Sequence, residues 1–204
     1  MQNIKAIIFD FGGVILDIDY NKTSKAFKDL GVKNFEEMYS QKNANPLFHD
    51  LEEGKINEAA FYNAFRTSTN LKLTDQQINK AWNAMLLGYR TEALYTLEAI
   101  RQKYKLFLLS NTNIIHHTEF NKIYQDQIQH GALDDYFDKA YYSHEIGYRK
   151  PYKEAYEYVL KENKLFPSET LFIDDSIQNI DAAKNLRLQT ISLNDGMGIE
   201  DLGL

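Results

Sequence analysis

Residues 7–17 read IIFDFGGVILD, an apolar run that ends on Asp10 and passes through two glycines, Gly12 and Gly13. A carboxylate at the end of a buried strand is costly unless it meets a cation, hydrogen bonds or a chemical task. Glycines after such a strand indicate a turn whose backbone passes close to a ligand. Taken alone, the segment fits better an aspartate that only caps the strand end or the next turn. The rest of the chain must therefore show whether Asp10 is a capping residue or a functional one.

Short apolar segments recur along the chain in the pattern of strands that are covered on both faces of a parallel sheet. Helical patterns lie between them, over residues 91–104, 153–160 and 177–186. Because strands that alternate with helices form right-handed crossovers, the sequence predicts an α/β fold with a Rossmann-like parallel sheet core. The predicted strands are residues 5–9, 105–109, 139–142, 170–173 and 189–193.

Residues 19–87 break this alternation and contain only helical patterns. Thr74 and Gln77 have the spacing of a capping box. The aromatic residues of this stretch, Trp82 among them, are interpreted as the core of a small helical bundle. A bundle inserted after the first strand would stand over the carboxyl ends of the strands, where open parallel sheets bind ligands. Its expected helices are residues 21–30, 35–41, 57–67 and 74–85.

The composition restricts the classes of function. The chain has 204 residues, a net charge of −6 and charges of both signs along its length, which argues against a nucleic-acid partner or a membrane surface. It has no cysteine, so a thiolate nucleophile and a cysteine zinc site are excluded. We expect a cytoplasmic protein whose metal, if any, is held by oxygen or imidazole. The sequence does not indicate an oligomeric state.

Polar groups follow the strands of the predicted sheet. Carboxylates gathered there by adjacent strands would repel one another strongly unless a hard cation lay among them, and oxygen ligands favour Mg²⁺. A serine with the amides after it can bind phosphoryl oxygens, and a lysine can neutralise a dianion. Each group alone is common in caps and turns, whereas the ordered set indicates a functional site. The set is Asp10, Ser110 with Asn111, Lys150 within GYRKP (147–151), and Asp174 with Asp175 and Asn179.

These motifs resemble, in order, the four signatures of the haloacid dehalogenase-like (HAD) superfamily of hydrolases. The helical stretch resembles the superfamily's first type of cap. This resemblance implies a core domain at residues 1–17 and 88–204 and a cap at residues 18–87. Within the superfamily, the signatures are most similar to those of the bacterial α-D-glucose-1-phosphate phosphatase type, and the cap is less similar.

The resemblance implies a Mg²⁺-dependent phosphatase that acts on a small phosphorylated metabolite. It favours hexose phosphates such as glucose 1-phosphate as the substrate. Asp10 would attack phosphorus and form an aspartyl phosphate, which water then hydrolyses. The metal would bind Asp10, the Gly12 carbonyl and Asp175, with Asp174 as a direct or water-mediated ligand.

The resemblance also implies which residues hold the phosphoryl group during transfer. Ser110 and Lys150 would act as catalytic residues that bind it, together with the Asn111 amide. The glycines of the nucleophile loop, Gly12 and Gly13, would complete the phosphate site. Such a site works mainly by positioning and charge stabilisation.

One position departs from the superfamily pattern. Most of its phosphatases have a second aspartate two residues after the nucleophile, as general acid and base, and here that position is Gly12. Losing such a group typically costs about 10² to 10⁴ in rate. Either another carboxylate supplies the proton, or the leaving group does not need one, or the chain is catalytically weak or not a phosphatase. The candidate carboxylates are Asp17, Asp19, Glu52 and Glu53.

Two alternatives to a phosphatase remain at this point. A 2-haloacid dehalogenase of the same fold also lacks the second aspartate, but does not need Mg²⁺. A HAD-like fold kept as a non-enzymatic binding or regulatory module would show no Mg²⁺-dependent hydrolysis of p-nitrophenyl phosphate.

Other polar residues receive weaker interpretations. His116 and His117 are adjacent on an expected helix and point about 100° apart, so they cannot share a metal. We interpret them as surface or helix-start residues. The turn at residues 49–54 either faces the site and sets substrate choice or is simply an exposed polar turn. Tyr20 and Asn21 are candidates for the rim of the site.

Overall fold

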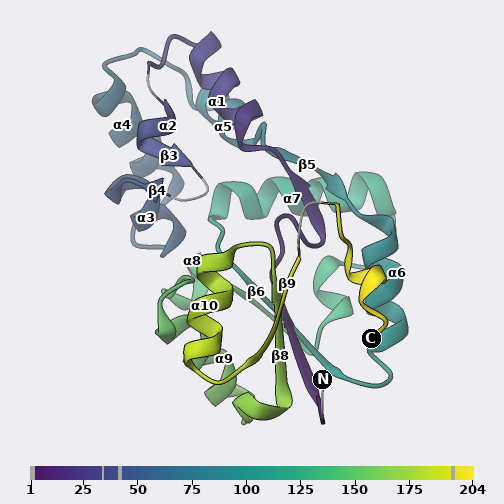
Figure 1. Ribbon diagram of the computed structural model, residues 1–204. Coiled ribbons are helices and arrows are strands. Elements are labelled where there is room, and N and C mark those ends of the chain that lie inside the picture. The colour runs from purple at the N-terminus through teal and green to yellow at the C-terminus, as the bar shows by residue number, and fades with distance from the viewer. Residues whose placement is uncertain (1–2, 34, 41–42, 194–195) are drawn as a thin grey trace.

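The computed structural model describes residues 3–33, 35–40, 43–193 and 196–204. Its centre is a five-stranded, all-parallel sheet in the order β7-β6-β1-β8-β9 (Figure 1). The α/β fold with a parallel core sheet is therefore confirmed. The strands are β1 (Ala6–Phe9), β6 (Lys105–Ser110), β7 (Lys139–Tyr142), β8 (Thr170–Asp174) and β9 (Gln189–Ser192).

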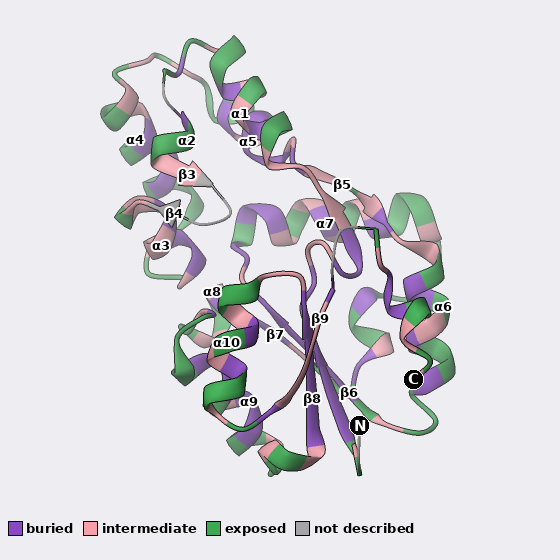
Figure 2. Ribbon diagram, viewed as in Figure 1, coloured by how far each residue is buried: buried purple, intermediate pink, exposed green. Residues whose placement is uncertain are grey.

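Helices cover both faces of this sheet, which explains the continuous apolar runs of its strands. In β1, Ile7 and Phe9 pack into the apolar cluster on one face, and Ala6 and Ile8 pack into the cluster on the other. Figure 2 shows the inner strands β6 and β8 buried, the edge strand β9 of intermediate burial, and the outer sides of the helices exposed. The helices of the core are α6 (Thr91–Ile100), α7 (Ile114–Ile128), α8 (Ser143–Ile146), α9 (Lys153–Glu162) and α10 (Ile177–Asn185), with short 3₁₀ turns at Leu133–Tyr136, Pro167–Glu169 and Ile199–Leu202.

A second apolar core lies in the helical insertion, which we call the cap (Figure 1). Aromatic rings fill it, and Trp82 is fully buried at its centre, as the sequence predicts. The capping box of Thr74 and Gln77 is present at the start of the last cap helix. The elements are α1 (Tyr20–Asp29), α2 (Phe35–Met38), β3 (Tyr39–Ser40), β4 (Asn43–Ala44), α3 (Pro46–Glu52), α4 (Glu58–Thr69) and α5 (Asp75–Asn83).

Two short antiparallel strands join cap and core. β2 (Leu16–Ile18) pairs with β5 (Leu86–Tyr89), although about 70 residues separate them in the sequence. The proposed domain boundaries at residues 17/18 and 87/88 fall inside these strands. We keep that division as a proposal, with the β2–β5 ribbon as the shared connection.

Several expected elements end at different residues. The helix expected over residues 35–41 ends at Met38, where β3 begins, and residue 41 lies outside the described residues. The helix expected over residues 91–104 ends at Ile100, whose carbonyl accepts hydrogen bonds from the amides of Lys103 and Tyr104. No helix among the described residues is long and apolar enough to cross a membrane.

Candidate active site

A cavity of about 360 Å³ lies where the carboxyl ends of the core strands meet the cap. Asp10, Ser110 and Lys150 from the core line one part of it. Tyr20 and Glu52 from the cap line another. The cavity is thus shared between cap and core, and its volume suits a small metabolite.

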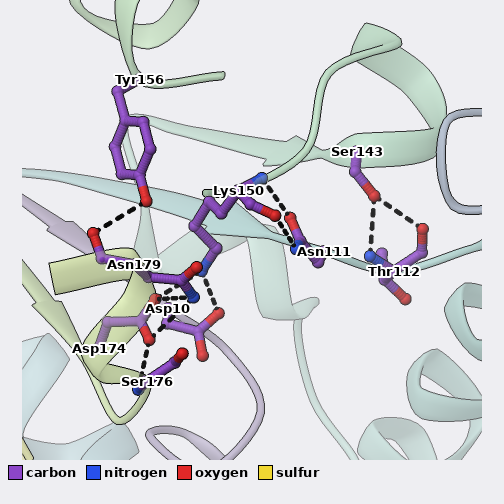
Figure 3. A network of polar contacts seen from close by, with 9 residues as sticks. All are labelled: Asp10, Asn111, Thr112, Ser143, Lys150, Tyr156, Asp174, Ser176 and Asn179. Carbon is purple, nitrogen blue, oxygen red and sulfur yellow. Dashed lines mark hydrogen bonds and ion pairs between the residues drawn. The ribbon is translucent and has the colours of Figure 1, made fainter. Parts of the chain in front are cut away.

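Asp10 follows β1, the central strand of the sheet, and its amide donates to the Ile173 carbonyl of β8 at 2.8 Å. This bond holds the aspartate beside Asp174, the last residue of β8. The Lys150 ammonium donates to Asp10 Oδ1 at 2.5 Å and to Asp174 Oδ2 at 2.8 Å (Figure 3). The structure therefore brings together the predicted nucleophile, lysine and first aspartate of the fourth motif.

Asp174 and Asp175 have different surroundings. Asp174 is fully buried, and its carboxylate accepts from the Ser176 amide at 2.7 Å and from Asn179 Nδ2 at 3.1 and 3.0 Å (Figure 3). Asp175 lines the cavity, next to Gly13, which has a φ of +79°. A Cβ at Gly13 would overlap the Asp175 carboxylate, so only glycine fits there. Asp175 is the one of the two that faces the cavity.

The carboxylates crowd one another. One oxygen each of Asp10, Asp174 and Asp175 lie within 4.8 Å of one another. Burial raises the pKa of Asp10 to about 7. The ammonium of Lys150 lowers this pKa, whereas the negative charges of Asp174 and Asp175 raise it further. Burial also raises the pKa of Asp175 to about 6, again with a contribution from Asp174. A divalent cation would relieve this repulsion, and the all-oxygen donor set fits Mg²⁺.

Lys150 stays charged in this buried position. Burial lowers the pKa of its ammonium, but the carboxylates of Asp10 and Asp174 raise it more, so the net direction is upward. Its backbone is fixed by the Asn111 side chain, which accepts from the Lys150 amide and donates to the Lys150 carbonyl, both at 2.8 Å. The sequence predicts the Asn111 amide as a phosphate ligand. It does not predict these two hydrogen bonds of the Asn111 side chain, which we call the Asn111 clamp.

Ser110 is the last residue of β6 and lines the cavity beside Asp10. The following turn is held by Ser143, whose hydroxyl donates to the Thr112 carbonyl at 2.8 Å and accepts from the Thr112 amide at 2.9 Å. Asn113 then caps α7 through the amides of Ile115 and His116. These bonds direct the Ser110 turn toward the cavity.

A buried ion pair between the cap and the core lies at the same cavity. Arg149 Nε lies 2.8 Å from Glu52 Oε2, in contact without the alignment of a hydrogen bond, and Tyr39 donates to Glu52 Oε1 at 3.0 Å. Arg149 Nη1 also lies 3.4 Å from His49 Nε2. Burial raises the pKa of Glu52, although Arg149 and the Tyr39 hydroxyl oppose the rise. His49 and Glu52, which the sequence placed in a turn, lie on α3 and face the site, and the turn itself comes at Gly54.

The structure distinguishes among the four carboxylates that the sequence suggests as proton donors. Asp17 pairs with Arg90 at 2.6 Å, Asp19 caps α1, and Glu53 pairs with Lys55 at 2.6 Å. None of these three lines the cavity. Glu52 does. Of the two rim candidates, Tyr20 lines the cavity and Asn21 does not.

The surface interpretation of His116 is wrong. The residue lies in the first turn of α7, as expected, but its side chain is only 6% exposed and lines the cavity. It stacks on Trp82 with ring centroids 4.5 Å apart. The cap covers this helix start, and no local sequence pattern reports such docking.

The chain is similar to known proteins over almost its whole length. The family model described as "haloacid dehalogenase-like hydrolase" matches residues 4–187. The D-ribitol-5-phosphate phosphatase of Bacteroides thetaiotaomicron is 33% identical over 95% of this chain and 93% of its own length. A HAD family enzyme from the same organism, solved with magnesium and inorganic phosphate, is 34% identical with a TM-score of 0.88 over 98% of both chains. A HAD-like hydrolase structure from Porphyromonas gingivalis is 32% identical over 96% of this chain and 93% of that one, with a TM-score of 0.86.

Proposed function

Because the chain belongs to the haloacid dehalogenase-like hydrolase family, we propose that it is a Mg²⁺-dependent phosphatase that works through an aspartyl phosphate on Asp10. The observation that carries this proposal is the placement of Asp10 at the end of the central strand, bonded to Lys150 and within 4.8 Å of Asp174 and Asp175. A dehalogenase of this fold does not need Mg²⁺ and so would not need this cluster of three carboxylates.

In the first step, an Asp10 oxygen attacks phosphorus as the bond to the leaving alcohol breaks. Lys150 balances the negative charge on the nucleophile and the phosphoryl group, and the Ser110 hydroxyl and the Asn111 amide bind phosphoryl oxygens. In the second step, a water oxygen attacks the same phosphorus and the bond to Asp10 breaks. Dividing the displacement in this way replaces one difficult step by two easier ones.

Mg²⁺ fits between the carboxylates, with Asp10, Asp175 and the Gly12 carbonyl as proposed ligands. Asp174 lies behind them, because its oxygens already accept from Lys150, Ser176 and Asn179. When bound, the metal supplies charge neutralisation between nucleophile and phosphate.

Glu52 is our candidate for the proton transfer that Gly12 cannot perform. Outside the aspartate cluster it is the carboxylate that lines the cavity among the described residues. As the acid, it would give its proton to the departing alkoxide. As the carboxylate, it would then take a proton from the attacking water, which restores the starting state.

The relatives change the expected substrate. The sequence favoured a hexose phosphate such as glucose 1-phosphate, whereas the 33% identical relative acts on D-ribitol 5-phosphate. We therefore propose an acyclic polyol phosphate as the substrate class, since the cavity suits a five-carbon chain in volume.

A phosphate-release assay with Mg²⁺ tests this proposal on D-ribitol 5-phosphate, glucose 1-phosphate, glyceraldehyde 3-phosphate and p-nitrophenyl phosphate. We expect the highest kcat/KM for the polyol phosphate and no release by Asp10→Asn on any compound. Preference for glucose 1-phosphate would overturn the substrate class alone. No Asp10-dependent release from any compound would support the binding-module alternative.

A further inference from the structure

His116 contributes a hydrogen-bond acceptor to the cavity wall. Its side chain lines the cavity and stacks on Trp82, and its Nδ1 lies 2.7 Å from Asn83 Oδ1. Its other ring nitrogen, Nε2, is buried and has no protein partner among the described residues. What Nε2 can bind depends on which nitrogen carries the proton.

A chain of hydrogen bonds through the cap fixes that proton. The Glu58 carboxylate can only accept, so the Tyr62 hydroxyl donates to it at 2.5 Å. Tyr62 therefore accepts from Asn79 Nδ2 at 3.0 Å, which leaves Asn79 Oδ1 to accept from Asn83 Nδ2 at 3.2 Å. Asn83 then presents Oδ1 to the imidazole, so Nδ1 of His116 carries the hydrogen. Nε2 is left with a free lone pair.

The ring is also neutral at the pH of an assay, because burial lowers the pKa of His116 to about 3. No carboxylate or cation among the described residues bonds to Nε2. Met85, Leu86 and Phe120 line the same cavity and offer no polar side-chain group there. Leaving a buried hydrogen-bond acceptor without a partner costs free energy, so we expect a bound ligand to donate a hydrogen bond to Nε2.

We propose that His116 Nε2 accepts a hydrogen bond from a hydroxyl of the substrate's carbon chain, and that this core histidine, oriented by the cap residue Asn83, selects hydroxylated substrates in this way. The proposal rests on the proposed function and names a specificity-determining residue for it. The fully ionised phosphate of a monoester has only acceptor oxygens and cannot fill this role. A hydroxyl at a fixed distance from the phosphate can, because a site built to bond a hydroxyl rejects analogues that lack it.

Nitrogen NMR on protein labelled at histidine tests the proposal in Asp10→Asn, which holds substrate without turnover. The His116 ring should show a protonated Nδ1 and an unprotonated Nε2. D-ribitol 5-phosphate should shift Nε2 as expected for an accepted hydrogen bond, and inorganic phosphate should not. A protonated Nε2, or no shift when the phosphorus spectrum shows the polyol phosphate fully bound, would overturn the proposal.

Kinetics provide a second test in the active enzyme. His116→Phe keeps a ring against Trp82 but has no acceptor, so KM for D-ribitol 5-phosphate should rise about tenfold while KM for p-nitrophenyl phosphate changes less than about twofold. His117→Phe makes the same change one residue away, outside the cavity, and should alter neither. An equal effect of His116→Phe on both substrates would show a packing role. Failure of wild type on the polyol phosphate alone would instead refute the substrate class.

Discussion

Lys150 shows how single residues decide this site. Its ammonium is buried between Asp10 and Asp174, and removing one partner of such a buried group leaves an uncompensated charge. The Asn111 side chain fixes the lysine backbone, so the loop after β6 controls where the ammonium lies. A phosphoryl-transfer site depends on that positioning more than on covalent chemistry.

Replacing Glu52 tests the proton transfer. Glu52→Gln removes the proton donor, so kcat for D-ribitol 5-phosphate should fall about 100-fold. Hydrolysis of p-nitrophenyl phosphate should slow by less than about threefold, because its leaving group barely needs an acid. Steady-state rates on the two substrates provide the comparison.

Glu53→Gln is the matched control, since Glu53 pairs with Lys55 away from the cavity. It should leave both rates unchanged. If Glu52→Gln slows both substrates to the same extent, the glutamate acts through its ion pair with Arg149 rather than as an acid.

The buried His116 predicts a loss of stability in acid. Burial lowers its pKa in the folded state to about 3, so the unfolded chain binds the extra proton as pH falls below the ordinary value of 6.5. Between pH 7.5 and 5 the wild type should lose about 2 kcal/mol of unfolding free energy from this residue. Urea unfolding at the two pH values measures it. His116→Phe should lose that much less, and equal losses in both proteins would contradict the assigned pKa.

The sequence predicts individual site residues well where a chemically reactive side chain stands at the end of a predicted strand. Asp10, Ser110, Lys150 and Asp175 each follow a pattern that places them at one edge of the sheet, and the structure puts all four on one cavity. His116 was misjudged because its burial depends on the docking of the cap. Side-chain partners across long sequence separations, such as the Asn111 clamp, leave no local pattern.

At the level of elements, the end of α5 is set by a residue from another helix. Thr23 on α1 is fully buried, donates to the Trp82 carbonyl at 3.0 Å and accepts from the Met85 amide at 3.0 Å. These bonds replace the next helical turn, so α5 ends at Asn83 rather than at residue 85.

Thr23→Val should therefore destabilise the cap, because it keeps the shape of the side chain but leaves both buried backbone groups unpaired. We expect a loss of about 2 kcal/mol in unfolding free energy by urea denaturation. Thr67→Val is a control on the exposed side of α4, where the hydroxyl bonds its own helix. A similar loss in both variants would mean that the Thr23 bonds do not stabilise the helix end.

The elements found from sequence are those with strong local signals. The inner strands β1, β6 and β8 are short, apolar and almost wholly buried, so they can be found from the sequence alone. The edge strands β7 and β9 are only partly buried, but they too stand out as short segments between helical patterns. β2 and β5 were not expected, because each is short and becomes a strand only by pairing with the other. α3 was not expected either, although Asn45 and Pro46 form a recognisable cap and first helical position.

In the whole molecule, the cap and the core meet through specific contacts around the cavity. The cap turn at Gly54 has a φ of +67°, and a Cβ there would overlap the carbonyl of His144 in the core. The Glu52–Arg149 ion pair crosses the same boundary, and Ile115 of α7 packs into the cap's apolar core. Residues of the cap and of the sheet edge thus line one cavity, in which the proposed substrate recognition and chemistry would both take place.

The most direct test of the account is detection of the covalent intermediate. Protein with Mg²⁺ and D-ribitol 5-phosphate is quenched in acid within the first turnover, and the peptide that contains Asp10 is analysed by mass spectrometry. The account predicts one phosphoryl group on Asp10 in the wild type and none in Asp10→Asn. Continued release of phosphate by the wild type with no label on Asp10, or with the label on another residue, would contradict it.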